Sequence, residues 1–211
     1  MECYDTVLQM ETWEQVIDKS RFIGVVFPVS STEEVEQKLG EVRQLYPGAR
    51  HYVYAYRLYN GRLEKSTDDG EPQGTGGRPV LDVLQYRQIW DVLIVVIRYF
   101  GGILLGAGGL TRAYGGTARQ LMDFASISRL IPHIIYELEA TYDWYEPLKY
   151  WLKQFTWTTA NEEFMATVKF QVYIPWEERE RFINWLSEFT QRQAVAREQG
   201  QILRAELLSK E

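Results

Sequence analysis

The chain has 211 residues, of which 45% are hydrophobic and 25% charged, with a net charge of −6, and this composition is typical of one large or two small globular domains. The single cysteine, Cys3, excludes an internal disulfide, and no apolar run approaches the ~20 residues that a membrane-spanning helix needs. The negative charge argues against a protein built only to coat nucleic acid. The acidic first 15 residues lack the basic and apolar regions of a signal peptide, so we expect a cytoplasmic protein with no membrane partner.

The first 130 residues alternate between strand and helix patterns. Ser31 and Glu34 have the spacing of a capping box, which predicts a helix start. Asn60–Gly61 is a strong hairpin signal, and Pro79 suits the first position of a helix. The predicted elements, in chain order, are strands over residues 4–10 and 20–29, a helix over 30–48, strands over 51–59 and 62–67, a helix from residue 79, a buried strand over 91–97 and a helix that includes residues 110–124.

The pattern restarts at residues 131–133. A helical stripe of aromatic and leucine residues runs from Trp144 to Phe155, and a polar turn is predicted at Asn161. The other predicted elements are strands over residues 134–142, 155–160 and 163–175, a helix over 176–190 and a strand over 201–208. This order is β-α-β-β-α-β, the ferredoxin-like unit. We therefore expect an α+β protein of two domains, residues 1–132 and 133–211.

The segment Arg98–Arg119, RYFGGILLGAGGLTRAYGGTAR, has seven glycines where the buried strand gives way to a helix. A backbone without Cβ atoms can turn sharply, approach a ligand closely and direct N–H groups at an anion. No P-loop lysine follows the glycines, and Thr111 stands where a dinucleotide fingerprint needs its third glycine. The alternative interpretation is that these glycines serve tight turns and close helix–strand packing.

A second glycine-rich loop, DDGEPQGTGGRP, covers residues 68–79. Its glycines and Arg78 are suited to a backbone nest that binds an anion. Its three acidic residues could hold a hard cation, but the EF-hand spacing is absent, so we predict no metal site. The alternative is a surface loop of turn-forming residues, although a loop of this length is more often functional or mobile than idle.

His51 lies on a predicted strand and has the chemistry of a general base or an anion ligand, although a lone histidine is more often structural. Tyrosines interleaved with arginines in the first half could stack bases or line the edge of the core. We assign no catalytic residue, metal ligand or cofactor. The candidate ligand-binding residues are His51, Asp68, Asp69, Gly70, Glu71, Gly74, Gly76, Gly77, Arg78, Arg98, Gly101, Gly102, Gly106, Gly108, Gly109 and Arg112.

Four segments of the chain resemble the IMPACT/YigZ family: SRFIG (residues 20–24), ARHYVYAYR (49–57), DDGEPQGTGGRP (68–79) and RYFGGILLGAGGLTRAYGG (98–116). Together with the C-terminal half, the resemblance covers essentially the whole chain. Family members commonly have a lysine where this chain has Leu104. A lysine there would contact phosphate, and leucine cannot, which leaves that role to Arg98 and Arg112.

The resemblance implies an N-terminal α/β domain of the ribosomal-protein-like superfamily with a left-handed crossover, an exception to the usual hand. It also implies a C-terminal ferredoxin-like domain similar to one in translation elongation factor G. Eukaryotic relatives regulate translation by interfering with activation of an amino-acid-starvation kinase, and a nucleic-acid role is suggested for the family by analogy between domains.

These observations predict a non-catalytic binding protein linked to translation. It would contact RNA, the ribosome or a phosphate-bearing ligand through its glycine-rich loops, with arginines supplying charge. The chain could instead be an enzyme that acts on a phosphorylated small molecule, with His51 or Asp69 as base. A third interpretation is a protein–protein regulator in which the glycines are only structural.

Overall fold

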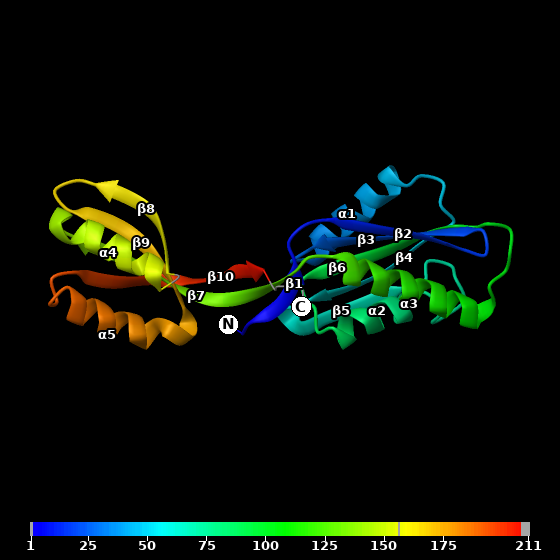
Figure 1. Ribbon diagram of the computed structural model, residues 1–211. Helices are drawn as coiled ribbons and strands as arrows, with labels where there is room; N and C mark the ends of the chain where they lie inside the picture. Colours follow the sequence, from blue (N-terminus) through cyan, green and yellow to red (C-terminus); the bar gives the residue numbers. More distant parts are fainter. Residues whose placement is uncertain (1, 156, 208–211) are drawn as a thin grey trace. The chain divides into compact units, whose positions relative to one another are not determined.

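The computed structural model describes residues 2–155 and 157–207, and the chain forms two compact units (Figure 1). Of the described residues, one unit comprises Tyr4–Arg129 with Leu207, and the other comprises Leu130–Glu206 with Glu2 and Cys3. Compact units are not the same as domains, which could fold alone. The domain boundary expected between residues 132 and 133 therefore stays a prediction. In the part of the chain that the structure describes, no helix is long and apolar enough to cross a membrane.

The first unit is built on a five-stranded antiparallel sheet in the order β2-β3-β6-β4-β5. The central strand β6 is buried over nearly all its length, as its unbroken run of branched apolar residues predicts. The elements of this unit are β1 (Tyr4–Val7), β2 (Glu11–Ile17), β3 (Ser20–Pro28), α1 (Thr32–Leu45), β4 (His51–Leu58), a 3-10 turn (Asn60–Arg62), β5 (Leu63–Thr67), α2 (Gly77–Tyr86), β6 (Val92–Tyr99) and α3 (Gly106–Phe124).

Helices cover both faces of this sheet (Figure 1). Alternate residues of β6 point to opposite sides, so Leu93 and Val95 pack with α1, whereas Ile94 and Val96 pack with α2 and α3. All four of these side chains are fully buried. The sheet is therefore the middle of three layers, and the α2/α3 face also carries the side chains of His51 and Arg98.

The two helical crossovers of this sheet have opposite hands. Helix α1 connects β3 to β4, two parallel strands with β6 between them, and α2 connects β5 to β6, two parallel strands with β4 between them. Rotating the sheet by half a turn about the axis perpendicular to it places the strand-to-strand path of one connection on that of the other. This rotation does not exchange the two faces of the sheet, yet α1 and α2 lie on opposite faces. One connection must therefore be left-handed, against the usual rule, and the expectation of a left-handed crossover is confirmed.

Three details of the first unit differ from the sequence prediction. Strand β2 was not predicted, because its inward-facing positions include the polar residues Glu11 and Gln15. Helix α2 begins at Gly77, so Pro79 occupies its third position rather than its first. The Ser31 hydroxyl caps α1 as expected, but the Glu34 carboxylate accepts the N–H of Ser30 and not that of Ser31.

The second unit is ferredoxin-like, as predicted. Strand β7 pairs with β9 and β10, and β9 pairs with β8, and both helices pack on one face of this sheet in a single core. Its elements are β7 (Ile127–Ala140), α4 (Tyr142–Gln154), β8 (Thr158–Phe164), β9 (Val168–Pro175), a 3-10 turn (Trp176–Glu178), α5 (Arg179–Phe189) and β10 (Val195–Leu207).

The turn predicted at Asn161 lies elsewhere. The chain reverses between β8 and β9 at residues 165–167, and Asn161 sits inside β8. It has φ +53°, where the β8–β9 register shifts between Ala160 and Glu163. Asparagine tolerates this left-handed conformation, so the polar residue marks a β-bulge rather than a turn.

Candidate anion-binding site

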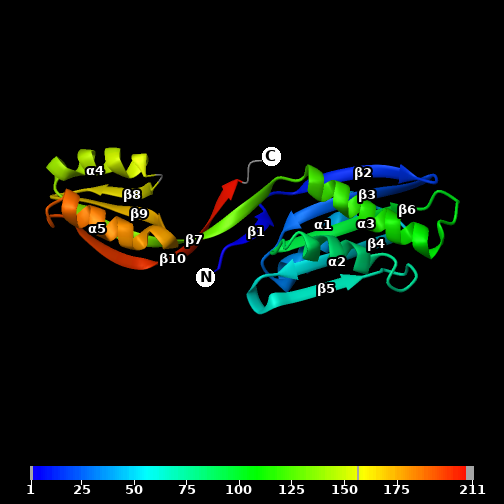
Figure 2. The ribbon, with the colours of Figure 1, turned by 60° about the horizontal axis from the view of Figure 1, so that its bottom comes forward.

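The floor of the candidate site is a cross-strand pair on the α2/α3 face of the first sheet. His51 at the start of β4 lies opposite Arg98 near the end of β6. The glycine-rich loop after β5 and the loop between β6 and α3 lie at this same end of the sheet (Figure 2). The fold thus brings the two glycine-rich segments together.

Glu71 connects the two segments. Its Oε1 accepts hydrogen bonds from Arg98 Nη1 at 2.6 Å and from the Tyr114 hydroxyl at 2.8 Å, and it lies 3.7 Å from His51 Nε2. The Glu71 and Arg98 side chains are each only 5% exposed. Burial and, after it, the hydrogen bond to Glu71 raise the pKa of Tyr114 well above its ordinary value, so the phenol stays a proton donor to the carboxylate.

Asp69 fixes the imidazole of His51. Its carbonyl oxygen lies 2.7 Å from His51 Nδ1, and because a carbonyl only accepts, Nδ1 carries the hydrogen. Its carboxylate accepts the backbone N–H of Tyr52 at 2.6 Å. Both polar ends of Asp69 are therefore used to hold the loop against β4, and His51 presents Nε2 toward Glu71.

Asp68 fills the backbone nest of its own loop. Its carboxylate accepts the N–H groups of Gly74 at 2.8 Å and of Gly76 and Gly77 at 2.9 Å. Burial raises the pKa of this carboxyl, but the three N–H hydrogen bonds outweigh burial and hold the pKa below its ordinary value. The nest predicted for an external phosphate thus holds an internal anion, and the N–H groups of these three glycines are not open to a ligand.

The N-terminus of α3 has no such partner among the residues that the structure describes. The first four N–H groups of any helix have no acceptor within it. Leu105 at the N-cap has no side-chain hydrogen bond to them, and the first turn contains no acidic residue. Gly106 enters the helix at φ +66°, a conformation that strongly favours glycine. This helix end therefore presents partial positive charge and unused donors.

A cavity of about 400 Å³ opens beside this helix end. Arg98 lines the cavity, and its buried Nε has no hydrogen-bond partner among the described residues. Across the described residues, the cavity is lined by Arg50, His51, Gly70, Glu71, Pro72, Arg98, Phe100, Leu104, Leu105, Gly106, Ala107 and Leu110. We call this the α3 pocket.

Some of the predicted glycines shape the α3 pocket without lining it. A Cβ on Gly101 would lie 2.0 Å from the carbonyl of Lys19, so only glycine fits where this loop crosses the turn between β2 and β3. The Gly101 N–H donates to the Ser20 hydroxyl at 3.2 Å. Gly102 lies in the same loop, and Gly108 and Gly109 lie in the first turn of α3.

Arg78 and Arg112 lie outside the α3 pocket. Arg78 is exposed on α2 and pairs with Asp82 at 2.7 Å. Arg112 is exposed on α3 and lines a second cavity, of about 860 Å³, between α2 and α3. The structure thus brings His51, Gly70, Glu71, Arg98 and Gly106 together and places these two arginines elsewhere.

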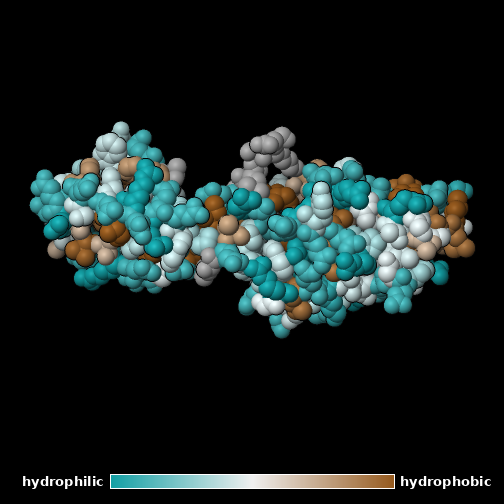
Figure 3. Space-filling view, turned by 90° about the horizontal axis from the view of Figure 1, so that it is seen from below, coloured by the Kyte–Doolittle hydropathy of each residue, from teal (hydrophilic) through white to brown (hydrophobic). Residues whose placement is uncertain are grey.

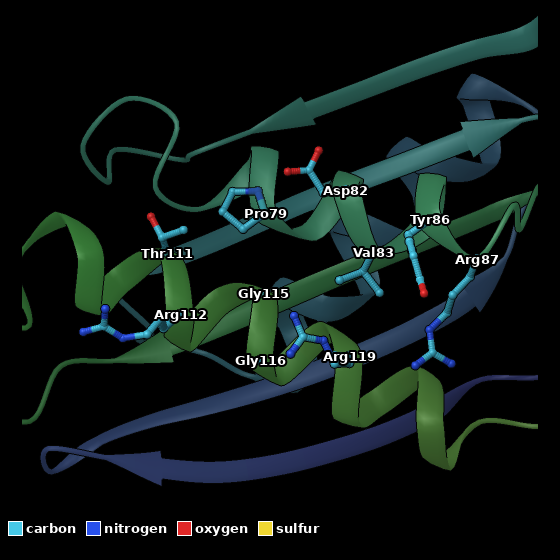
Figure 4. Close-up of a pocket in the computed structure, with 10 residues that line it drawn as sticks. All are labelled: Pro79, Asp82, Val83, Tyr86, Arg87, Thr111, Arg112, Gly115, Gly116 and Arg119. Atoms are coloured by element: carbon cyan, nitrogen blue, oxygen red, sulfur yellow. The ribbon is translucent and has the colours of Figure 1, made fainter.

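The second cavity, which we call the α2/α3 groove, is lined by Pro79, Asp82, Val83, Tyr86, Arg87, Thr111, Arg112, Gly115, Gly116 and Arg119 (Figure 4). Arg87 forms an ion pair with Asp123, but no ion pair to Arg112 or Arg119 occurs within the described residues. Tyr86 is 90% exposed. Arg119 and Tyr86 were not among the candidate residues predicted from the sequence. The seven-residue spacing of Arg112 and Arg119 corresponds to two turns of one helix, and this spacing is the signal that could have identified Arg119.

The described residues contain no group of three or more His, Cys, Asp or Glu side chains placed to hold a metal ion. The acidic residues of the glycine-rich loop instead point in different directions. Asp68 binds its own loop, Asp69 binds β4, and Glu71 binds Arg98 and Tyr114.

The fold is that of a two-domain protein, with a three-layer α/β unit followed by a ferredoxin-like unit. The first domain carries a candidate anion site, where an uncapped helix end lies beside a buried arginine. Residues 18–122 match the Impact N-terminal domain, and residues 138–191 match DUF1949, a domain of unknown function. The chain belongs to the IMPACT family, which confirms the resemblance found in the sequence.

Relatives in bacteria match both domains. The IMPACT family member YvyE of Bacillus subtilis is 35% identical over 90% of this chain and 88% of its own, and YigZ of Escherichia coli is 34% identical over 82% and 87%. Protein IMPACT-B of Xenopus tropicalis is 37% identical over 44% of this chain and 31% of its own. A crystal structure titled as that of a hypothetical protein covers 93% of this chain and 97% of its own, at 31% identity and a TM-score of 0.61.

Proposed function

We propose that this protein binds phosphate-bearing ligands, without catalysis, in the α3 pocket. The observation that carries the proposal is the uncapped N-terminus of α3 beside a cavity that Arg98 also lines. A helix end with free N–H groups is a ready-made anion site. Arg98 is held by Glu71, and Arg50 at the exposed rim adds a second positive charge.

Ala107 gives a clean test, because it is exposed, lies in the first turn of α3 and lines the pocket. An acidic residue there stabilises a helix by about 0.3–1 kcal/mol and would place a fixed negative charge where the phosphate binds. We expect Ala107→Glu to fold at least as stably as the wild type and to lose phosphate binding. Ala107→Gln, of similar size and no charge, should retain it.

The measurement is thermal unfolding over a series of inorganic phosphate concentrations at constant ionic strength. A ligand that binds the folded state raises the unfolding temperature with its concentration. The proposal fails if phosphate leaves the wild type unchanged, or if Ala107→Glu and Ala107→Gln respond equally.

For the α2/α3 groove, which continues along the same helix as the α3 pocket, RNA is the phosphate-bearing ligand that we favour. Arg112 and Arg119 lie about 10.5 Å apart along the axis of α3, at 1.5 Å per residue, and no ion pair to either occurs in the described part of the chain. The exposed ring of Tyr86 adds a surface on which a base can stack.

A labelled single-stranded RNA, titrated at several salt concentrations, tests this choice. Each phosphate contact contributes about 0.7 to the salt slope for a single strand, so the double variant Arg112→Gln with Arg119→Gln should lower the slope by about 1.4. Arg43→Gln removes one positive charge, as each of the two groove substitutions does, but from α1 at the opposite face of the sheet, and should leave the slope unchanged. The choice of RNA would be overturned if the affinity did not depend on salt concentration. It would also be overturned if Arg43→Gln weakened binding as much as the groove variants.

A further inference from the structure

The wall of the α3 pocket differs from its floor. The floor is polar and formed by His51, Glu71 and Arg98, whereas the wall is formed largely by apolar side chains, those of Pro72, Phe100, Leu104, Leu105 and Leu110. Small-molecule sites are mostly apolar with a few placed polar groups. The pocket of about 400 Å³ falls in the ~300–1,000 Å³ range of sites that enclose a whole small molecule.

The loop between β6 and α3 exposes an unusual amount of apolar surface. Leu104 is 87% exposed, and Phe100 and Ile103 are about 40% exposed; hydrophobic side chains gather at the end of the first unit where this loop lies (Figure 3). Single exposed apolar residues are ordinary, but Phe100 and Leu104 both line the mouth of a charged pocket. A ligand with an apolar body would cover them.

The charge of the pocket suits a ligand with one phosphoryl group. Among the described residues that line the pocket, Arg50 and Arg98 bring two positive charges and Glu71 brings one negative charge. The helix end adds about half a positive charge. The sum of about +1.5 matches the charge of a phosphate monoester, about −1.5 to −2 at neutral pH, more closely than that of a diphosphate or triphosphate.

We propose that the α3 pocket takes a phosphate monoester whose other end is aromatic or apolar, with Leu104 and Phe100 contacting that end. This inference rests on the proposed function, because it assigns the phosphoryl group to the same helix N-terminus. Leu104 is then a specificity-determining residue, which selects the organic part of the ligand and leaves the phosphoryl contacts unchanged.

The experiment compares the affinities of phenyl phosphate, glycerol phosphate and inorganic phosphate by isothermal titration calorimetry. Covering about 60–80 Å² of apolar surface at ~25 cal/mol/Å² corresponds to a tightening of about tenfold or more. Phenyl phosphate should therefore bind at least tenfold more tightly than glycerol phosphate, and glycerol phosphate should bind about as tightly as inorganic phosphate.

Two variants of the same loop provide the control. Leu104→Ser should reduce the preference for phenyl phosphate to about threefold or less while inorganic phosphate binds as before. Ile103→Ser changes a residue of the same loop that does not line the pocket and should leave the preference intact. Both side chains are substantially exposed, so neither variant is expected to unfold.

The outcomes separate this inference from the proposed function. If all three compounds bind equally, or if Ile103→Ser and Leu104→Ser have the same effect, the assignment of the apolar end is wrong and the phosphate site stands. If none of the three binds, the proposed function itself fails.

Discussion

The two glycine-rich segments of the first domain have similar compositions, but their backbone N–H groups differ in whether they have an acceptor. In the loop after β5, three glycine N–H groups converge on a carboxylate that the same loop supplies, that of Asp68. At the start of α3, the N–H groups meet no acidic side chain of the first turn and no cap from Leu105. The first segment satisfies its own donors, whereas the donors of the second have no side-chain acceptor in the part of the chain that the structure describes.

This difference shows that a glycine-rich loop is not by itself evidence for a ligand. What matters is whether the chain also supplies an acceptor. Helix α1 makes the same point, because its N-terminus has both the Ser31 hydroxyl and acidic residues at positions 33 and 34, and it is therefore closed to an external anion. Among these three N–H clusters, the start of α3 is the one that remains open.

The largest effect is expected from breaking the link between the two segments. Glu71→Ala leaves Arg98 buried without its counter-ion and Tyr114 without its acceptor. Removing one partner of a buried ion pair costs about 3–5 kcal/mol, so urea unfolding should show a loss of that size. A loss below about 1 kcal/mol would mean that the two segments are not held together through Glu71.

A smaller effect is expected from emptying the nest. Asp68→Ala removes the acceptor of three N–H groups, and because the loop is partly exposed and water can replace part of the loss, we expect about 2 kcal/mol of destabilisation. The emptied nest should then resemble the start of α3, so phosphate should raise the unfolding temperature of this variant more than that of the wild type. An equal phosphate response in both proteins would contradict the comparison.

The smallest effect concerns pH. The pKa of Asp68 is lowered in the folded protein, so its contribution to stability is present above its unfolded-state pKa of about 3.9 and is lost as pH falls through the lower folded-state value. The difference in unfolding free energy between wild type and Asp68→Asn should be constant near neutral pH and shrink below about pH 4. A difference that grows as the solution is acidified would contradict this assignment.

Much of the fold could be predicted from the sequence, because local patterns determined it. Helix α1, the buried strand β6 and the ferredoxin-like order followed from capping residues and apolar periodicity. Strand β2 was missed because Gln15, on its inner face, donates to the Thr117 hydroxyl at 2.7 Å, a contact 102 residues away along the chain that makes a polar residue suitable for an inner position.

The candidate site could be predicted only in part. His51, Glu71 and Arg98 are brought together by strand register and loop closure, and the sequence suggested that meeting only through the composition of the two loops. The nest was recognised, but the identity of its anion was not, since Asp68 lies six to nine residues before the glycines it binds. Arg112 lies on α3 and lines the α2/α3 groove rather than the α3 pocket that Arg98 lines. Apolar periodicity does not show which of two neighbouring cavities an exposed helical residue lines.

The central claim is that only one of the two glycine-rich segments is open to an anion. Titration of ¹⁵N-labelled protein with inorganic phosphate, followed by amide chemical shifts, tests it most directly. The account predicts that the amide signals of Gly106, Ala107 and Gly108 shift in a saturable manner while those of Gly74, Gly76 and Gly77 stay in place. Shifts confined to the second group, or equal in both, would contradict it.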